Sequence, residues 1–373
     1  NSICQGQQVP ILWPLIFKTG HEINFAHTSF KWANLASHNA GVVVAIIGIT
    51  SEKKIKQKSL FYLSPNNEQL EKLTDNINAY LTTGVNIIVE KRSKPLSEMP
   101  AMYFGSKAVD DGNFFLTKSE LDQLQLDREV VDKYVKPIRG SAEFIKGVER
   151  FCIWINNEDL ENASSVDFIN KRLAKIRAFR ENSTKPATRS IANTPHKFGE
   201  VRQKGIEKSI IIPSVSSDNR PYLPVGLLPK GTIISNLAFG IFDPSLWHLS
   251  IIASKIHLAW VAAVCGRLGT GYRYSNTLAW NTFPIPKLTE KNKEDLTRCA
   301  EDILLAREAH FPATIADLYD PEKMPENLRR AHDRNDEVLE RIYIGRRFKN
   351  DTERLEKLFD LYTKMTNKKE VAK

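Results

Sequence analysis

The sequence predicts a mixed α/β plus α+β fold: the edge of a partial Rossmann-like sheet, a mixed α+β domain and a C-terminal helical segment. Three observations predict it. One helix-period stretch and two strand-like stretches open the chain, short β-branched runs between prolines and glycines fill its middle, and charged stretches of helical period end it. With 373 residues the chain is long enough for two or three domains. We place them at residues 1–94, 95–286 and 287–373.

The first domain begins with a helix and continues as the rim of a sheet. Apolar residues recur at helical spacing over Gln8–Thr19, and Gly20 is placed to end this helix. The following stretches predict a short strand at His21–His27, a polar aromatic loop at Thr28–Asn39, a β-branched strand at Val42–Ile49 and a further strand at Val85–Glu90. A complete doubly wound domain needs several more strands, so only the far edge of one is expected.

The middle domain alternates short strands with turns, and the last domain is helical. Strands are predicted at Phe151–Asn156 and Ser209–Val215, and the proline and glycine density of Asn219–Gly231 is typical of a turn-rich sheet. Leu246–Leu268 is apolar throughout and predicts one long helix. From Thr289 onward, apolar residues recur at helical spacing among many charges.

The charge balance favours an acidic partner such as nucleic acid. Lys and Arg number 53 against 44 Asp and Glu, which gives a net charge of +9. The window Lys171–Lys208 alone holds eleven Lys/Arg and three Glu. Two interpretations of this window stay open: a solvated helix and loop, or a surface that follows phosphates. In the second case Arg177, Arg180, Lys185 and Arg189 are its candidate DNA contacts.

Several kinds of chemistry are excluded by what the sequence lacks. It has no GxSxG, HExxH or GxxxxGK[ST] motif, and its eight histidines show no metal-ligand spacing. We interpret His248 and His257, in the apolar stretch, as core histidines, and we expect neither a metal nor a self-contained reaction centre. Four widely spaced cysteines and no membrane-length apolar run predict a cytoplasmic protein with reduced thiols and no membrane partner.

The stretch "CGRLGTGYRYSNTLAWNTFPIP", Cys265–Pro286, is unlike ordinary core sequence. Arg267 and Arg273 flank a flexible tip, Gly269-Thr270-Gly271, and several aromatic residues follow. Three roles are open to such a stretch: a catalytic loop, a packed turn or a surface that reads nucleic acid. Arginine can make two parallel hydrogen bonds to guanine in the major groove, which is the contact that the last role would use.

Several stretches, taken in order, resemble a known family. "NSICQGQQVPILWPLIF", "INFAHTSFKWAN" and "AGVVVAIIGI" resemble the closing part of the catalytic domain of adenine-specific DNA methyltransferases. "IIPSVSSDNRPYLPVGLL", "HLAWVAAVCGRLGTGYRYSNTLAWNTFPIP" and "IADLYDPEKMPENLRRAHDRNDEVLERIYIG" resemble the target-recognition and C-terminal regions of MmeI-like enzymes. Those bacterial enzymes fuse a nuclease, an S-adenosylmethionine-dependent methyltransferase and a DNA-reading domain. The family's Asn-Pro-Pro-aromatic loop and glycine-rich cofactor turn are not found in this sequence.

The resemblance implies roles for particular residues. Phe30, with Trp32 nearby, occupies the place of an aromatic residue that stacks on the extruded base, although both could equally cover a sheet edge. The tip residues Gly269, Thr270, Gly271, Tyr272 and Arg273, and an earlier point at Asn236 and Leu237, match the positions that carry specificity. We expect Arg273 to read bases and Arg267 to be structural. Ser216, Ser217 and Arg220, with Ser214 and Asn219, could donate to phosphates or bases or form a plain turn.

We therefore interpret the chain as the C-terminal part of an MmeI-like restriction-modification enzyme that reads double-stranded DNA. The resemblance implies S-adenosylmethionine as the cofactor of the intact enzyme, an upstream methyltransferase half and a nuclease as partners in the same polypeptide, and no catalysis by this chain alone. One alternative is a stand-alone DNA-binding specificity subunit. Another is a protein-interaction scaffold whose basic face is incidental, for which affinity for DNA would depend little on salt.

Overall fold

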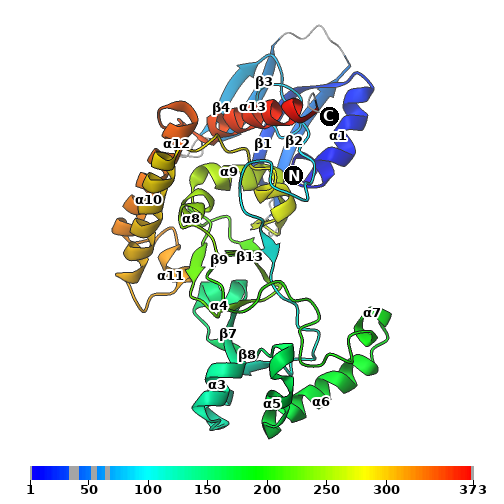
Figure 1. Ribbon diagram of the computed structural model, residues 1–373. Helices are drawn as coiled ribbons and strands as arrows, with labels where there is room; N and C mark the ends of the chain where they lie inside the picture. The colour runs from blue at the N-terminus through cyan, green and yellow to red at the C-terminus, as the bar shows by residue number, and fades with distance from the viewer. Residues whose placement is uncertain (1, 33–41, 52–56, 64–67, 371–373) are drawn as a thin grey trace, which may run out of the picture.

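The computed structural model describes residues 2–32, 42–51, 57–63 and 68–370. Four strands at one end form an N-terminal sheet in the order β2-β1-β3-β4 (Figure 1). β1 (Glu22–Trp32) pairs antiparallel with β2 (Val42–Thr50) and parallel with β3 (Lys58–Leu63), and β4 (Gln69–Thr74) lies beside β3. The chain enters through η1 (Ser2–Cys4) and α1 (Gln8–Lys18), which buries Val9 and Trp13. Gly20 follows the helix end at φ +84, which is the conformation expected for a residue that ends a helix.

Two expectations for this region are wrong. β1 continues to Trp32, so Thr28–Trp32 lie in a strand and not in a loop, and the rest of the expected loop falls outside the described residues. Val85–Glu90 forms no strand: Ile87 and Val89 are buried as extended chain, and the Val89 N–H donates to the Tyr80 hydroxyl (2.9 Å). A buried extended segment and a strand have the same composition, which explains the error.

The middle of the chain forms two four-stranded sheets and a three-stranded one. The first sheet has the order β11-β9-β13-β5, the second β12-β7-β8-β6 and the third β10-β15-β14. Their strands are β5 (Tyr103–Phe104), β6 (Phe115–Thr117), β7 (Val135–Arg139), β8 (Arg150–Ile153), β9 (Ser209–Pro213), β10 (Val215–Ser216), β11 (Gly226–Leu228), β12 (Ile233–Ile234), β13 (Ala238–Phe242), β14 (Gly266–Leu268) and β15 (Gly271–Arg273). The strands predicted at Phe151–Asn156 and Ser209–Val215 are thus present, the second divided between β9 and β10.

The part of the middle region farthest from the N-terminal sheet has a hydrophobic core of its own. Phe114, Leu116, Trp154 and Phe198 belong to it, together with the inner face of α6. Its helices are α2 (Lys118–Gln123), α3 (Arg128–Tyr134), α4 (Ser141–Lys146), α5 (Leu160–Ser164), α6 (Asp167–Glu181) and α7 (Pro186–Arg189). Figure 1 shows α6 and α7 as an arm that projects to the side of the molecule on which α1 lies.

The long helix predicted at Leu246–Leu268 is wrong: the structure divides it. α8 (Trp247–Ile252) and α9 (Lys255–Val264) are separate because the Ser254 hydroxyl caps α9 by accepting from the His257 N–H (3.2 Å). The last three residues of the stretch form β14. The end of the chain is helical as predicted, with α10 (Glu290–Glu308), α11 (Ile315–Leu318), α12 (Glu326–Ile344) and α13 (Asp351–Glu370).

One large core joins the two ends of the chain. It includes Trp13 on α1, Trp260 on α9 and Phe359 on α13, together with Ile23, Ala26 and Leu60 of the N-terminal sheet. The N-terminal sheet, α8–α9 and the C-terminal helices therefore pack as a single body. No helix among the described residues is long and apolar enough to cross a membrane. Within the same residues, no group of three or more His, Cys, Asp or Glu is placed to hold a metal ion.

Candidate nucleic-acid interface

The arginine-bearing stretch folds as a β-hairpin. β14 and β15 pair antiparallel, with Gly266 opposite Arg273 and Leu268 opposite Gly271, and β10 adds a third strand along β15. Gly269 takes φ +61 in the turn, a conformation that favours glycine. Gly271 has a different reason: a Cβ there would lie 2.8 Å from the Ser216 carbonyl oxygen. The two glycines therefore shape the turn and allow close approach of β10.

Arg267 holds the hairpin from within. Its Nη1 donates to the Thr270 carbonyl (2.6 Å) and lies 3.6 Å from the Asp218 carboxylate. Its guanidinium carbon lies 4.7 Å from the centre of the Tyr272 ring. These contacts give Arg267 the structural role expected of it, and they cover one face of the Tyr272 ring.

Arg273 has the opposite surroundings. Its side chain is exposed, and within the described part of the chain it forms neither an ion pair nor a side-chain hydrogen bond. Its strand is fixed on both sides, since Arg273 is opposite Val215 of β10 and Gly266 of β14. An unengaged guanidinium on a rigid strand is able to meet a partner without first giving up an internal contact.

Aromatic residues anchor the foot of the hairpin. Tyr274 is buried, its N–H donates to the Ser214 carbonyl (2.9 Å), and its hydroxyl is hydrogen-bonded to His257 Nε2 (3.0 Å). Trp280 is buried and donates from Nε1 to the Pro100 carbonyl (2.8 Å). Burial lowers the pKa of His257 to about 3, so this ring is neutral at pH 7. His248 is also buried, with its pKa lowered to about 4, so both histidines belong to the core as predicted.

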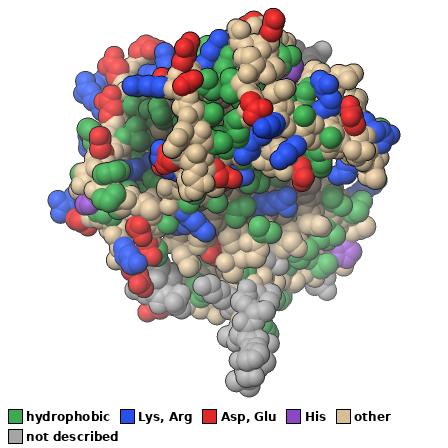
Figure 2. Space-filling model, turned by 90° about the horizontal axis from the view of Figure 1, so that it is seen from below, with side chains coloured by type: hydrophobic (Ala, Val, Ile, Leu, Met, Phe, Trp, Pro, Cys, Tyr) green, Lys and Arg blue, Asp and Glu red, His purple; other side chains and the backbone are tan. Residues whose placement is uncertain are grey.

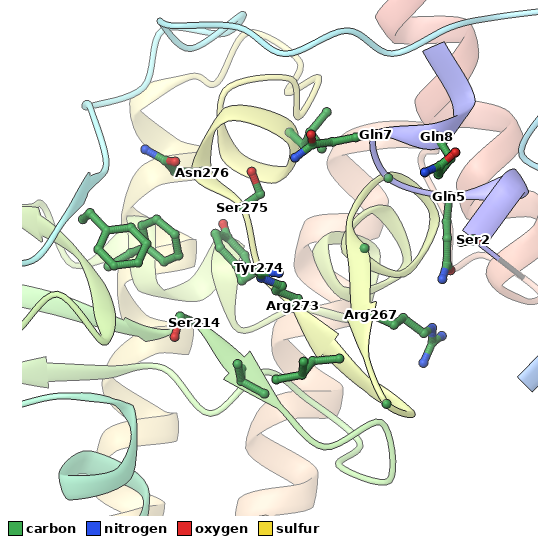
Figure 3. A pocket seen from close by; sticks show the side chains of 18 of the residues that line it. Ser2, Gln5, Gln7, Gln8, Ser214, Arg267, Arg273, Tyr274, Ser275 and Asn276 are labelled. Atoms are coloured by element: carbon green, nitrogen blue, oxygen red, sulfur yellow. The ribbon is translucent and has the colours of Figure 1, made fainter. Parts of the chain in front are cut away.

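A cleft of about 1080 Å³ lies between the hairpin and the N-terminal segment (Figure 3). One wall carries Gln5, Gln7 and Gln8 at the entry to α1, and the other carries Arg273, Tyr274, Ser275 and Asn276. Gly6 allows the two walls to meet at the base, because at φ +62 a Cβ would lie 3.0 Å from the Gly266 nitrogen. Amides, hydroxyls and one free guanidinium line the cleft beside apolar side chains such as Phe104 and Leu268. The polar groups suit the edges of bases and phosphates.

The structure brings the two predicted specificity points together. Asn236 and Leu237 line the same cleft as Gly269 and Arg273, although more than thirty residues separate them in the chain. Leu237 is 54% exposed, and the Asn236 side chain makes no hydrogen bond within the described residues. Ser214, at the edge of the cleft, donates its hydroxyl proton to the Leu237 carbonyl (2.7 Å) and so supports this turn.

Ser216 ends β10, and Ser217 and Arg220 flank the turn that follows it; none of the three lines the cleft. Ser216 is buried against β15, so the prediction that it contacts DNA is wrong. The Ser217 hydroxyl accepts from the Asn219 N–H (3.3 Å), and Arg220 Nη1 lies 3.5 Å from the Ser216 hydroxyl. Of the two interpretations left open for this stretch, these contacts favour the turn.

Phe30 and Trp32 lie on β1, apart from the cleft. Their ring centres are 6.2 Å apart; Phe30 is half-buried and Trp32 is 49% exposed. They are opposite Val44 and Val42 in the pairing of β1 with β2, and neither lines the cleft. Stacking on an extruded base stays a prediction for both residues.

The basic window separates into surface and core. Arg177, Lys185 and Arg189 are exposed on α6 and α7. Arg180 is fully buried and donates to backbone carbonyls on every side, so the prediction that it contacts DNA is wrong. Seen from the end that carries α3 and α5, Lys and Arg side chains spread over the face, several of them beside Asp or Glu (Figure 2).

The comparisons with known proteins agree along most of the chain. The family models for the MmeI DNA-methyltransferase domain, the MmeI target recognition domain and the MmeI C-terminal domain match residues 1–62, 83–287 and 288–369. The chain belongs to the MmeI family. The cleft thus lies where the part matched by the MmeI methyltransferase model meets the part matched by the target-recognition model.

This MmeI-family chain is similar to a curated DNA methyltransferase and to a solved structure of a restriction-modification enzyme. DNA methyltransferase A of Bacillus subtilis (strain 168) is 42% identical over 369 residues, 99% of this chain and 41% of the relative. A solved structure of the Type IIL restriction-modification enzyme MmeI in complex with DNA matches with a TM-score of 0.83 and 36% identity, over 98% of this chain and 49% of that one. This chain spans less than half the length of either relative.

The MmeI-family cleft also contains residues that the sequence did not reveal. Gln5, Gln7 and Gln8 are opposite the hairpin, and Asn276 lines the cleft while it donates to the Met102 carbonyl (2.8 Å). The one signal in the sequence was three glutamines within four residues at the start of an apolar helix.

Proposed function

We propose that the chain reads double-stranded DNA in the cleft between the hairpin and the N-terminal segment. One observation carries the proposal: Arg273, Asn236 and Leu237 line the same cleft, and Arg273 has no partner among the described residues. A duplex groove offers acceptor and donor edges that arginine and amides recognise. A relative solved in complex with DNA supports the same partner.

The reaction served by this reading is methylation of an adenine by an S-adenosylmethionine-dependent methyltransferase of a bacterial restriction-modification system. The relative named DNA methyltransferase A and the match to the methyltransferase model support it. This sequence contains neither the Asn-Pro-Pro-aromatic loop nor a glycine-rich cofactor turn, so its residues do not fit the cofactor and no catalytic step is assigned to them. The remaining methyltransferase elements, and a nuclease where one is present, are the partners within the same polypeptide. We place the protein in the cytoplasm, where its four buried cysteines stay reduced.

Paired arginine variants test the reading role. Arg273→Ala should relax preference at one base position, a loss of about 1–3 kcal/mol or roughly 5- to 150-fold in discrimination, and keep general affinity. Arg267→Ala should weaken binding to every duplex, because it removes the contacts that hold the hairpin. Selection from a random duplex library measures both effects, and Arg298→Ala, an exposed change on α10, is the control.

Three results would contradict the proposal. The first is unchanged base preference in Arg273→Ala. The second is affinity for DNA that stays flat between low and moderate salt, which would favour the scaffold alternative because phosphate contacts release counterions. The third is tight stoichiometric binding of S-adenosylmethionine to this chain, measured by calorimetry, which would contradict the assignment of the cofactor to elements outside it.

A further inference from the structure

The arm formed by α6, α7 and their connection, residues 167–189, presents cations without acidic partners. Lys175, Arg177 and Lys185 are exposed and form no ion pair with any described residue. Lys171 differs, since its ammonium lies 2.7 Å from Asp167. Arg189 is exposed and donates to the Ser183 carbonyl (2.7 Å), which ties α7 to the end of α6. The arm therefore carries a concentrated positive charge that the protein itself does not neutralise.

The arm is held rigidly by its buried face. Ile169, Leu173 and Ile176 pack into the second core, and Arg180 closes the same face of α6 with hydrogen bonds to the carbonyls of two separate loops. Arg172 adds two bonds, to the Asn113 and Phe115 carbonyls (both 2.9 Å). A charged surface on a fixed scaffold binds at a lower entropic cost than a charged tail.

We propose that this arm is a second contact with duplex DNA, outside the reading cleft, that binds the phosphate backbone without regard to sequence. The proposal rests on the proposed function, since it takes the duplex in the cleft as its partner. Figure 1 shows the arm extending to the side of the molecule on which α1 lies, and Gln8, the first residue of α1, lines the cleft. A rod-shaped polyanion held in the cleft continues beyond it on either side, and the arm offers cations to that continuation.

These three side chains are suited to bind phosphate groups. Each side chain is a donor without an acceptor inside the protein. None of them is held on a paired strand as Arg273 is, so none is positioned to read base edges. Contacts of this kind fix the register and orientation of a duplex and supply salt-dependent affinity equally to every sequence. The arm thus adds affinity, while the cleft supplies discrimination.

A charge-matched pair of variants of the 373-residue chain tests the arm. The first variant combines Lys175→Gln, Arg177→Gln and Lys185→Gln. The second combines Arg298→Gln, Lys323→Gln and Arg329→Gln, three exposed cations on the α10–α12 side, opposite the arm in Figure 1. Both variants lose the same net charge, so a difference in their affinity for DNA depends on where the charges were removed. Thermal melting confirms that each variant is folded.

Binding to a selected and to a random duplex is measured between 50 and 200 mM salt. Three lost phosphate contacts lower the salt slope by about 2.7, so wild type should lose roughly 40-fold more affinity over this range than the arm variant. The loss should be the same for both duplexes, and the control variant should keep the wild-type slope. Equal slopes for the two variants, or an arm effect confined to the selected duplex, would overturn the proposal.

A cross-link locates the contact directly. All four native cysteines are buried, so a cysteine introduced at an exposed position carries the accessible thiol for a photo-cross-linker. Lys185→Cys should cross-link to both duplexes, and Lys323→Cys to neither. Leu268→Cys, on the hairpin, reports on the cleft. A cross-link from residue 268 without one from 185 would overturn the arm alone, whereas no duplex binding by wild type would overturn the proposed function as well.

Discussion

Arg180→Met removes a guanidinium whose five N–H groups all have acceptors. Nε donates to the Val109 carbonyl (2.9 Å), Nη1 to Ile191 and Thr194 (3.1 and 2.9 Å), and Nη2 to Ala108 and Lys197 (3.1 and 2.7 Å). The side chain is fully buried, and its burial lowers the pKa of the guanidinium. Methionine retains much of the apolar stem but none of the donors, so the change isolates the hydrogen bonds.

The magnitude follows from what the five carbonyls retain. Ala108, Ile191 and Thr194 keep a second donor each, from the N–H groups of Gly199, Thr194 and Lys197. The carbonyls of Val109 and Lys197 have no other donor among the described residues. Two part-buried acceptors left unsatisfied cost about 1–3 kcal/mol each. Removal of the buried charge offsets part of this cost. We therefore expect the free energy of unfolding to fall by about 3–5 kcal/mol, which is large for a single substitution.

Hydrogen exchange of the amides in residues 191–199 and urea denaturation measure this loss. Arg177→Met, on the exposed face of the same helix, is the control and should change stability by less than about 0.5 kcal/mol. Arg180→Lys should fall between the two, because an ammonium has three donors that diverge from one point. If Arg180→Met lies within about 1 kcal/mol of Arg177→Met, the carbonyls find other donors and the reasoning is refuted.

Two further predictions follow from burial and from close approach. The folded-state pKa values of His248 and His257, about 4 and about 3, lie below the unfolded value near 6.5, so their contribution to stability is full above pH 6.5 and is lost as the pH falls. At pH 5 each histidine should lower the free energy of unfolding by about 2 kcal/mol relative to pH 7.5, as measured by urea denaturation. If the free energy of unfolding of His257→Gln fell as steeply with pH as that of wild type, this prediction would be contradicted. Gly271→Ala places a Cβ 2.8 Å from the Ser216 carbonyl and should separate β15 from β10, with about tenfold weaker duplex binding and faster exchange confined to residues 266–273. Unchanged binding would show that the hairpin adapts.

The elements predicted correctly are those in which burial imposes a period on the sequence. α1 and the C-terminal helices each bury one face, and their apolar spacing shows it, whereas β2 was predicted from its run of β-branched residues. The break between α8 and α9 could not be predicted this way, because both helices are apolar and one capping serine, Ser254, divides them. β1 was predicted too short because its second half carries polar and aromatic residues, which lack the apolar pattern of a buried strand.

The cleft was predictable from one wall only. The hairpin is a local structure, and its glycines and arginines stand together in the sequence. Gln5 and Gln7 reach the opposite wall through packing of the N-terminal segment against Gly266, some 260 residues away. No periodicity or spacing encodes such a contact between distant segments, because it is a product of the shared core.

Arginines show most clearly why charge alone could not identify the interface. Over the basic window a count of charges weighs Arg177 and Arg180 equally, yet the first is exposed and the second has every donor engaged inside the protein. The hairpin repeats the contrast, since Arg267 engages Thr270 and Asp218 through Nη1 and Tyr272 through its planar face, which stiffens the strands that present Arg273. A guanidinium on a fixed strand, with its end free, loses little conformational entropy when it binds in a groove. In the proposed reading of DNA, the engaged arginine therefore supports the free one, because it sets the geometry that the free one needs.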